Sequence, residues 1–232
     1  MYRGIHEECG VFGIRSNKTT NLASVVYHAL YALQHRGQES CGIAINDGET
    51  IIGHKDLGLV SDVFTREVLE KLPEGHMAIG HCRYCTAEEE TVANSQPLVI
   101  KHVKGNMAVA FNGGLTNASK LREELELSGA IFHTTSDVEV IAYVITKERL
   151  STPTIEDAIS RAMLKIQGAY SLAIMTQKKL IAVRDPLGFR PLCIGKIEDD
   201  YIIASESCAL DSIGAQFIKD VRPGEIIVID DN

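Results

Sequence analysis

The sequence has 232 residues and carries 23 lysines and arginines against 31 aspartates and glutamates, so its formal net charge is −8. No stretch is rich in lysine and arginine, and this argues against a nucleic-acid partner, because binding phosphate backbones takes a positive surface. Hydrophobic residues make up 45% of the chain and charged residues 23%, a composition that indicates a globular protein and excludes a disordered one.

The sequence predicts no membrane partner and no secretion. Its longest apolar runs, such as Ile226–Ile229, fall far short of the ~20 residues that a membrane-spanning helix needs. Residues 1–8 lack the apolar segment of a secretory signal, so we expect a cytoplasmic location. In that reducing compartment the six cysteines are not expected to form a disulfide framework.

Apolar residues recur at helical spacing in four segments. Each segment follows a residue that can cap a helix: Asn21, Asn117, Ser136 and Thr154. Ser136 and Glu139 have the spacing of a capping box, in which each side chain bonds the other residue's backbone. Gly129 and Gly168 are expected to end the second and the fourth helix.

Shorter apolar runs predict strands, several of them joined by links short enough for antiparallel hairpins. The expected strands are Val11–Arg15, Gly42–Asn46, Thr50–His54, Met77–Arg83, Met107–Phe111, Tyr170–Thr176, Leu180–Arg184, Pro191–Gly195, Tyr201–Ser205 and Glu225–Asp230. Strands and helices do not alternate strictly, which disfavours a parallel doubly wound sheet. The pattern therefore predicts an α+β fold in a single domain.

Cys9 is the first candidate for chemistry. It opens a predicted strand and precedes a glycine, so little side-chain bulk shields its thiol. If residues 1–8 were removed, the α-amino group of Cys9, with a pKa of ~7.7–8.0, could act as a base for its own thiol. The alternative is an ordinary buried thiol at the start of a strand.

Cys82 and Cys85 form a Cys-x-x-Cys pair around Arg83. A zinc site would need a second ligand pair, and a redox pair would need a thioredoxin-like context, and the sequence offers neither. Arg83 is the more informative residue, because its guanidinium can hold a carboxylate through two hydrogen bonds. The alternative for Arg83 is a surface ion pair.

Two further segments combine polar side chains with a break in regular structure. Asn112 and Gly113 could direct a side-chain amide and a backbone N–H at a developing oxyanion, or could simply form a turn. Asp137, at a predicted helix start, could hold an ammonium group or only favour the helix dipole. Arg36 precedes Gly37, which permits close backbone approach beside a site.

Taken together and in chain order, these segments resemble the class II glutamine amidotransferases, a group of N-terminal nucleophile hydrolases, and most closely their phosphoribosyltransferase-linked branch. The motifs that carry the resemblance are CGVFG at 9–13, ALQHRGQESCG at 32–42, GHCRYCT at 80–86, NSQPL at 94–98, NG at 112–113, SDVEVI at 136–141 and RDPLGFRPL at 184–192. The resemblance covers nearly the whole chain.

The resemblance implies a four-layer αββα sandwich, with residues 1–8 as a propeptide and 9–232 as the amidotransferase domain. It also implies roles for individual residues. Cys9 would attack the glutamine side-chain amide, and Asn112 and Gly113 would form the oxyanion hole. The substrate-binding residues would be Arg83 with Thr86 at the α-carboxylate, Asp137 at the α-ammonium, and Arg36 in support of the nucleophile.

An enzyme of this kind hydrolyses glutamine through a thioester, and the glutaminase step requires no cofactor. The ammonia would serve synthesis of 5-phosphoribosylamine from phosphoribosyl pyrophosphate in de novo purine biosynthesis, on a phosphoribosyltransferase domain or subunit outside these 232 residues. The full-length enzyme would be a homo-oligomer, with magnesium and an iron–sulfur cluster as further expected components. Cys208, within SESCALD at 205–211, would be one cluster ligand.

The sequence departs from the family pattern beside the site. Cys85 stands where the family has Ser or Pro, residues 88–90 are all glutamate, and Phe111 and Gly114 flank the Asn-Gly pair. Two alternatives therefore stay open. One is a catalytically silent glutamine-binding or regulatory module, and the other is the glutaminase subunit of another amidotransferase.

Overall fold

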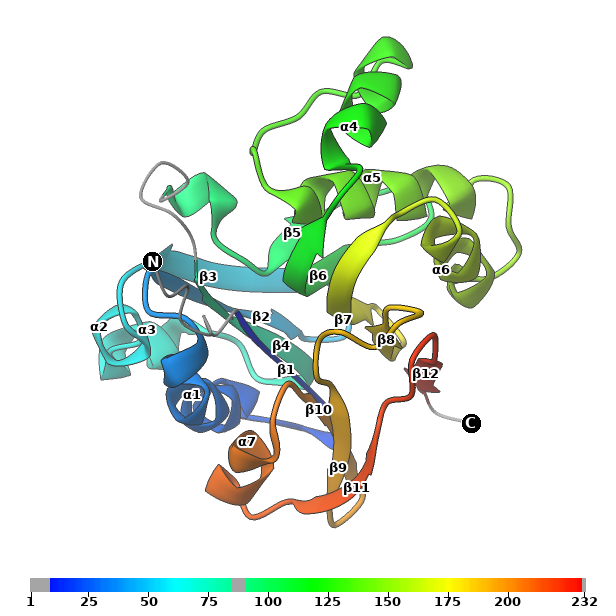
Figure 1. Cartoon of the computed structure of the whole chain (residues 1–232). Helices are drawn as coiled ribbons and strands as arrows, with labels where there is room; N and C mark the ends of the chain where they lie inside the picture. Colours follow the sequence, from blue (N-terminus) through cyan, green and yellow to red (C-terminus); the bar gives the residue numbers. More distant parts are fainter. Residues whose placement is uncertain (1–8, 85–90, 231–232) are drawn as a thin grey trace, which may run out of the picture.

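The computed structural model describes residues 9–84 and 91–230, and these form two antiparallel sheets stacked between two layers of helices (Figure 1). The α+β, four-layer αββα architecture that the sequence and its family resemblance predicted is confirmed. The predicted propeptide, residues 1–8, lies outside the described residues. None of the helices in residues 9–84 and 91–230 has the length and apolar character of a bilayer-spanning segment.

The first sheet, sheet A, has the strand order β11-β9-β10-β1-β4-β2-β3. Its strands are β1 (Gly10–Thr20), β2 (Ser40–Asn46), β3 (Ile51–Leu57), β4 (Gly75–Arg83), β9 (Cys193–Ile197), β10 (Asp200–Ala204) and β11 (Gln216–Asp220). β1 lies at the centre and pairs with β10 and β4, so Gly10 lies opposite Cys82. This pairing places the start of β1 beside the end of β4.

The second sheet, sheet B, has the order β12-β8-β7-β6-β5. Its strands are β5 (Leu98–Ile100), β6 (Met107–Leu115), β7 (Gly168–Thr176), β8 (Leu180–Arg184) and β12 (Ile226–Ile229). β6 and β7 form a long ladder that runs from Met107 opposite Thr176 to Leu115 opposite Gly168. β6 therefore pairs with β7 along its whole length, with Met107 at one end of the ladder and Leu115 at the other.

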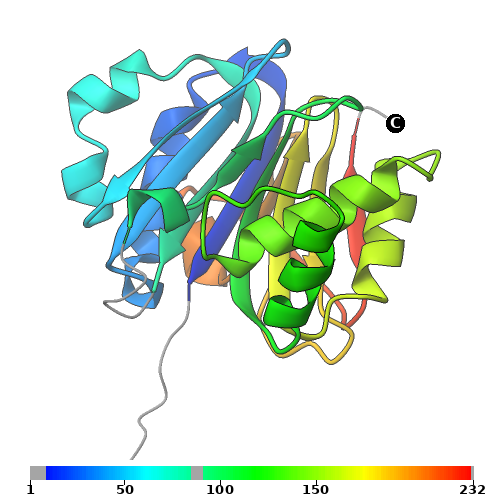
Figure 2. The same ribbon diagram turned by 90° about the horizontal axis from the view of Figure 1, so that it is seen from above.

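Helices cover the outer face of each sheet. Their bounds are α1 (Leu22–Ala32), α2 (Val60–Val63), α3 (Arg66–Lys71), α4 (Ala118–Leu127), α5 (Asp137–Arg149), α6 (Ile155–Met163) and α7 (Ser207–Ser212), with short 3-10 turns at Gln34–Arg36 and Val92–Asn94. α1 and α7 lie on sheet A, whereas α4, α5 and α6 lie over sheet B (Figure 1). Figure 2 shows the same two sheets from above.

Three apolar clusters fill the spaces between the layers. One joins α1 to sheet A, a second joins α5 and α6 to sheet B, and a third lies between the sheets. The inner cluster includes Val11, Met77, Ala108, Ala110 and Ala173. Because the central strands are covered on both faces, their sequences are continuous apolar runs and do not alternate.

Two of the four predicted helix caps are confirmed and two are not. Asn21 and Thr154 accept backbone N–H groups of their helices, as expected. The capping box at Ser136 is wrong, because the Glu139 carboxylate instead accepts the backbone N–H groups of His133 and Thr134. Asn117 lies at the start of α4, but its side chain bonds the segment before β7.

Gly168 does not end a helix, as the sequence suggested. α6 stops at Met163, and Gly168 begins β7 with a positive φ of 142°. The sequence also gave no signal for β5, β11 and the short helices α2, α3 and α7. β11 is exposed along its whole length, so it lacks the apolar pattern by which strands are recognised.

Candidate active site

Cys9 lies where β1 begins, beside the end of β4. Its side chain is almost fully buried, with 8% of its surface exposed. The sulfur accepts the Tyr84 backbone N–H at 3.4 Å and lies 3.6 Å from the Tyr84 carbonyl oxygen. Sheet pairing therefore fixes the thiol against the backbone that follows Arg83.

A cavity of about 250 Å³ opens beside Cys9. Its walls come from both sheets and from the start of α5, and are formed by Cys9, Arg83, Tyr84, Gln96, Phe111, Gly113, Gly114, Thr135, Ser136 and Asp137. The fold thus brings together four of the residues that the sequence singled out: Cys9, Arg83, Gly113 and Asp137. They are up to 128 positions apart in the chain, from residue 9 to residue 137.

Asn112 lies in β6 and is completely buried. Successive strand residues face opposite sides, so Asn112 shares the inner side of sheet B with Ala108 and Ala110. Within the described part of the chain, neither its side-chain oxygen nor its nitrogen has a hydrogen-bond partner. A buried amide without partners is costly. Asn112 is not among the residues that line the cavity beside Cys9, whereas its neighbours Phe111 and Gly113 are.

Gly113 has a backbone conformation that residues with a Cβ rarely adopt. Its φ is +139°, and a Cβ at this position would lie 1.9 Å from the Ala169 carbonyl oxygen. Glycine therefore allows β6 to press against β7 and leaves the backbone of Gly113 on the cavity wall. This is more than the turn that an Asn-Gly pair suggests, because Asn112 and Gly113 both remain in a strand.

Arg83 and Asp137 supply the cavity's two opposite charges. Arg83 is the last residue of β4 and is 5% exposed. Asp137 is the first residue of α5, and its carboxylate accepts the Leu115 backbone N–H at 2.8 Å. A cation and an anion on one cavity wall suit a zwitterionic ligand, such as a free amino acid.

Arg36 lies behind the nucleophile. Its Nε donates to the Cys9 carbonyl oxygen at 3.0 Å, and its guanidinium also bonds the Glu206 carboxylate. Burial alone would raise the pKa of Glu206, but hydrogen bonds from Arg36 and His35 lower it overall. Arg36 is not among the cavity's lining residues, and its bond to the Cys9 carbonyl oxygen places it behind Cys9.

Two polar residues that received no role from the sequence bond the backbone of Phe111, the residue before Asn112. Gln96 accepts the Phe111 N–H at 2.7 Å, and His81 Nε2 donates to the Phe111 carbonyl oxygen at 2.8 Å. Burial lowers the pKa of His81 to about 3, so the ring is neutral. His81, a polar residue inside the apolar strand β4, could have been noticed for that reason. Gln96 lies in the loop before β5, and its only signal was its place in the motif at 94–98.

Some predicted features cannot be placed in this cavity. Thr86, Cys85 and the glutamates at 88–90 lie outside the described residues. Cys82 is fully buried and donates to the Leu30 carbonyl oxygen, and burial raises its pKa well above the usual value. Its thiol is therefore inert, which disfavours metal or redox chemistry.

Cys208 lies in α7, with its sulfur near His35 and Glu206. Burial and the Glu206 carboxylate raise the pKa of the Cys208 thiol. Among residues 9–84 and 91–230 no second cysteine joins this group, so these residues do not form a cluster site. Nor does the trio suit magnesium, which prefers oxygen ligands.

Comparisons with known proteins show the family of this chain. A family model described as a glutamine amidotransferase domain matches residues 81–212, more than half of the chain. The chain belongs to the glutamine amidotransferases, as a class II domain. It is 51% identical to the amidophosphoribosyltransferase of Methanocaldococcus jannaschii, over 96% of this chain and 47% of that protein.

Two solved structures match the fold closely. One, described as the allosteric regulatory enzyme of purine biosynthesis, superposes with a TM-score of 0.90 at 43% identity. The glutamine phosphoribosylpyrophosphate amidotransferase of Bacillus subtilis gives a TM-score of 0.88, also at 43% identity. Each alignment covers 96% of this chain and 47% of the other. The chain thus spans about half the length of these relatives.

Proposed function

We propose that this chain hydrolyses the side-chain amide of glutamine, with Cys9 as an N-terminal nucleophile after loss of residues 1–8. The observation that carries the proposal is the cavity that joins a buried thiol to Arg83, Asp137 and the strand of Asn112 and Gly113. The family membership of the chain supports the reaction class, and the lining of the cavity supports the roles proposed for Cys9, Arg83, Gly113 and Asp137.

Glutamine binding rests on the two charged side chains. Arg83 holds the α-carboxylate through its guanidinium, with Thr86 assisting, and Asp137 holds the α-ammonium. With both ends of the amino acid fixed, the side chain can extend toward Cys9. This arrangement selects a free amino acid, because a peptide-bonded glutamine lacks one or both charges.

The reaction then proceeds in two steps. In the first, Cys9 Sγ bonds the amide carbon while its thiol proton passes through its α-amino group to the departing nitrogen; the C–N bond breaks and ammonia leaves. In the second, water attacks the carbonyl carbon of the thioester and the C–S bond breaks. Glutamate forms, and a proton from the water restores the thiol. Asn112 and the Gly113 N–H stabilise the oxyanion of both steps.

Arg36 acts as a positioning residue in this proposal. It bonds the Cys9 carbonyl oxygen, so it can hold the nucleophile's main chain after residues 1–8 have been removed. Glu206 in turn fixes the guanidinium. The pair therefore orients the α-amino group and the thiol without touching glutamine.

We further propose that the ammonia is passed to a phosphoribosyltransferase domain or subunit, which makes 5-phosphoribosylamine for purine biosynthesis. Support comes from 51% identity to an amidophosphoribosyltransferase. Homo-oligomer formation, a magnesium ion, an iron–sulfur cluster and cytoplasmic location belong to this wider proposal. Glutamine-dependent consumption of phosphoribosyl pyrophosphate, measured with a transferase part supplied, tests it; no consumption would contradict it.

The glutaminase proposal is tested by itself. Purified chain beginning at Cys9 should release equal amounts of glutamate and ammonia from glutamine. Asparagine, which is one methylene shorter, should be a poor substrate because its amide would stop short of the thiol. Bound glutamine without release of either product would instead favour the catalytically silent module.

A further inference from the structure

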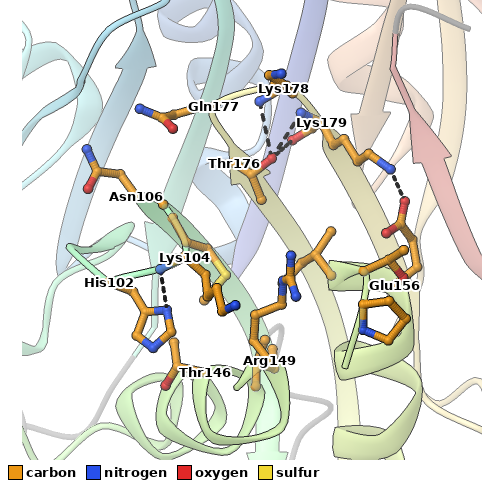
Figure 3. A pocket seen from close by; sticks show the side chains of 16 residues that line it. His102, Lys104, Asn106, Thr146, Arg149, Glu156, Thr176, Gln177, Lys178 and Lys179 are labelled. Atoms are coloured by element: carbon orange, nitrogen blue, oxygen red, sulfur yellow. Dashed lines mark hydrogen bonds and ion pairs between the residues drawn. The ribbon is translucent and has the colours of Figure 1, made fainter. Parts of the chain in front are cut away.

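A second cavity, of about 290 Å³, lies at the other end of β6. Met107, the first residue of that strand, lines this cavity, whereas Gly113 lines the active-site cavity. At ~3.3 Å per strand residue, Met107 and Gly113 are about 20 Å apart along β6. The second cavity is enclosed by the β5–β6 connection, the junction of α5 and α6, and the β7–β8 turn (Figure 3).

Positive side chains dominate this cavity, which we call the basic pocket. Four cations line it, namely Lys104, Arg149, Lys178 and Lys179, and Glu156 is the one carboxylate among its lining residues in the described part of the chain. These five side chains have an excess of three positive charges, in a chain whose net charge is −8. Such a local reversal of charge favours anions.

The carboxylates near the basic pocket leave most of this charge uncompensated. Lys179 bonds Glu156 and lies 3.5 Å from Asp230. Across residues 9–84 and 91–230, no carboxylate pairs with Lys104, Arg149 or Lys178. Figure 3 shows the Arg149 and Lys104 side chains extending into the space between α5 and the β7–β8 turn. An anion in this space would meet both.

Two contacts hold these groups in place. Arg149 Nη1 donates to the Thr152 carbonyl oxygen at 2.6 Å, which leaves the other guanidinium nitrogens for a ligand. His102 accepts the Lys104 backbone N–H at 3.2 Å. Burial, Arg149 and Lys104 all lower the pKa of His102. The cations are therefore close enough together to repel a further positive charge.

The rest of the lining suits a small organic anion. Asn106, Gln177 and Thr146 add polar groups, while Met107 and Ile145 add apolar surface. The first turn of α6 also lines the cavity, but its Glu156 and Asp157 carboxylates offset the positive end of the helix dipole, so the positive charge comes from the four cationic side chains. The volume is at the lower end of the ~300–1,000 Å³ usual for ligand pockets, so the ligand must be small.

We propose that the basic pocket binds the phosphate group of a small phosphorylated compound, at a site separate from the glutamine cavity. Arg149 would hold two phosphate oxygens through its planar guanidinium, and Lys104 and Lys178 would act as point charges. Met107 and Ile145 would contact the organic part. The proposal does not depend on the glutaminase reaction.

Isothermal titration calorimetry with the 232-residue chain tests this proposal. Inorganic phosphate and phenyl phosphate are the two probes, at constant ionic strength. Both should bind, with phenyl phosphate tighter because its ring buries apolar surface. Arg149→Ala should weaken both roughly tenfold or more, since a charge-assisted hydrogen bond is lost, and Arg149→Lys should lose less.

Lys120→Ala is the matched control, because Lys120 is an exposed lysine of α4 that lies 4.0 Å from Glu124, outside the basic pocket. It should leave both affinities unchanged, whereas Lys104→Ala should weaken them. Thermal unfolding of each variant reports whether the fold is kept. Absence of binding by both probes would overturn the proposal, and so would equal weakening by Lys104→Ala and Lys120→Ala.

Discussion

The two ends of β6 present two different kinds of site. At the Gly113 end, the functional groups are buried and held by the sheets: Arg83 is 5% exposed and Asn112 is fully buried. At the Met107 end, long cationic side chains extend from loops and from the end of α5. The first site has fixed geometry and little mobile charge, whereas the second has charge and flexible side chains.

This difference in burial and charge predicts a difference in how the two cavities select a ligand. Buried groups are costly to leave unpaired, so the Asn112 amide, which has no partner within the described residues, should favour one ligand shape strongly. Exposed lysines attract any anion and are screened by salt. Binding at the Gly113 end should therefore depend on the exact shape of the ligand, whereas binding in the basic pocket should depend mainly on the ligand's charge.

Replacement of the nucleophile should have the largest effect. Cys9→Ala should lower glutamine hydrolysis by at least about 10⁴-fold, because loss of a nucleophile removes the covalent route. Cys193→Ala is the matched control, since Cys193 is a buried thiol of β9 with its pKa raised to about 12. Hydrolysis is followed as glutamate release, and substantial activity in Cys9→Ala would contradict the assigned nucleophile.

The next effect separates two fully buried asparagines. Asn112→Ala should lower kcat about 10²- to 10³-fold, as expected for an oxyanion-hole donor. Its thermal stability should change little, because the amide has no partner within the described residues. Asn46→Ala should do the opposite, since Asn46 bonds Thr176 and Gly48 at 2.9 Å each. Equal loss of stability in the two variants would contradict the unpaired state of Asn112.

Substrate binding should respond to Asp137. Asp137→Asn retains an oxygen for the Leu115 N–H and removes the charge. The KM for glutamine should rise roughly 10- to 100-fold, since a hydrogen bond to a charged group contributes ~1.5–3 kcal/mol. Asp157→Asn, a change of the same kind in the first turn of α6, is the control. An unchanged KM in Asp137→Asn would remove Asp137 from glutamine binding.

Per pH unit, the smallest expected effect is on stability, and it is tested by comparing a histidine from each end of β6. His81 has a pKa of about 3 in the folded chain against an ordinary 6.5, so between these values the unfolded chain binds the extra proton. Stability should therefore fall as the pH drops below 6.5, by up to about 1.4 kcal/mol per pH unit. Urea unfolding of His81→Gln should lose this dependence.

His102→Gln provides the comparison at the basic pocket. The pKa of His102 is also lowered, but the ring is half-buried and not fully buried, so its contribution to the pH dependence should be smaller. Equal changes in the two variants would contradict the difference in burial between the two ends.

Much of the fold could be predicted from the sequence, because local patterns determined it. Helical spacing of apolar residues after Asn21 was enough to predict α1, and continuous apolar runs were enough to predict β1, β4 and β7. β11 could not be predicted, since an exposed edge strand has no apolar pattern. The capping box at Ser136 failed because Glu139 bonds backbone groups whose position depends on the preceding loop.

The site was predictable only as separate residues. Family motifs singled out Cys9, Arg83 and Asp137, but their shared cavity depends on strand pairing across the whole chain. The contact of Arg36 with Glu206 joins residues 170 positions apart. The basic pocket gave no sequence signal, because its cations come from three unrelated segments that only the fold brings together.

The central claim is that Cys9 acts with its own α-amino group as base. The most direct measurement follows intact mass and glutamate release together, on preparations in which residues 1–8 are present, partly removed or fully removed. Activity should rise in proportion to the fraction of chains that begin at Cys9. Full activity with residues 1–8 still attached, or none when the chain begins at Cys9, would contradict it.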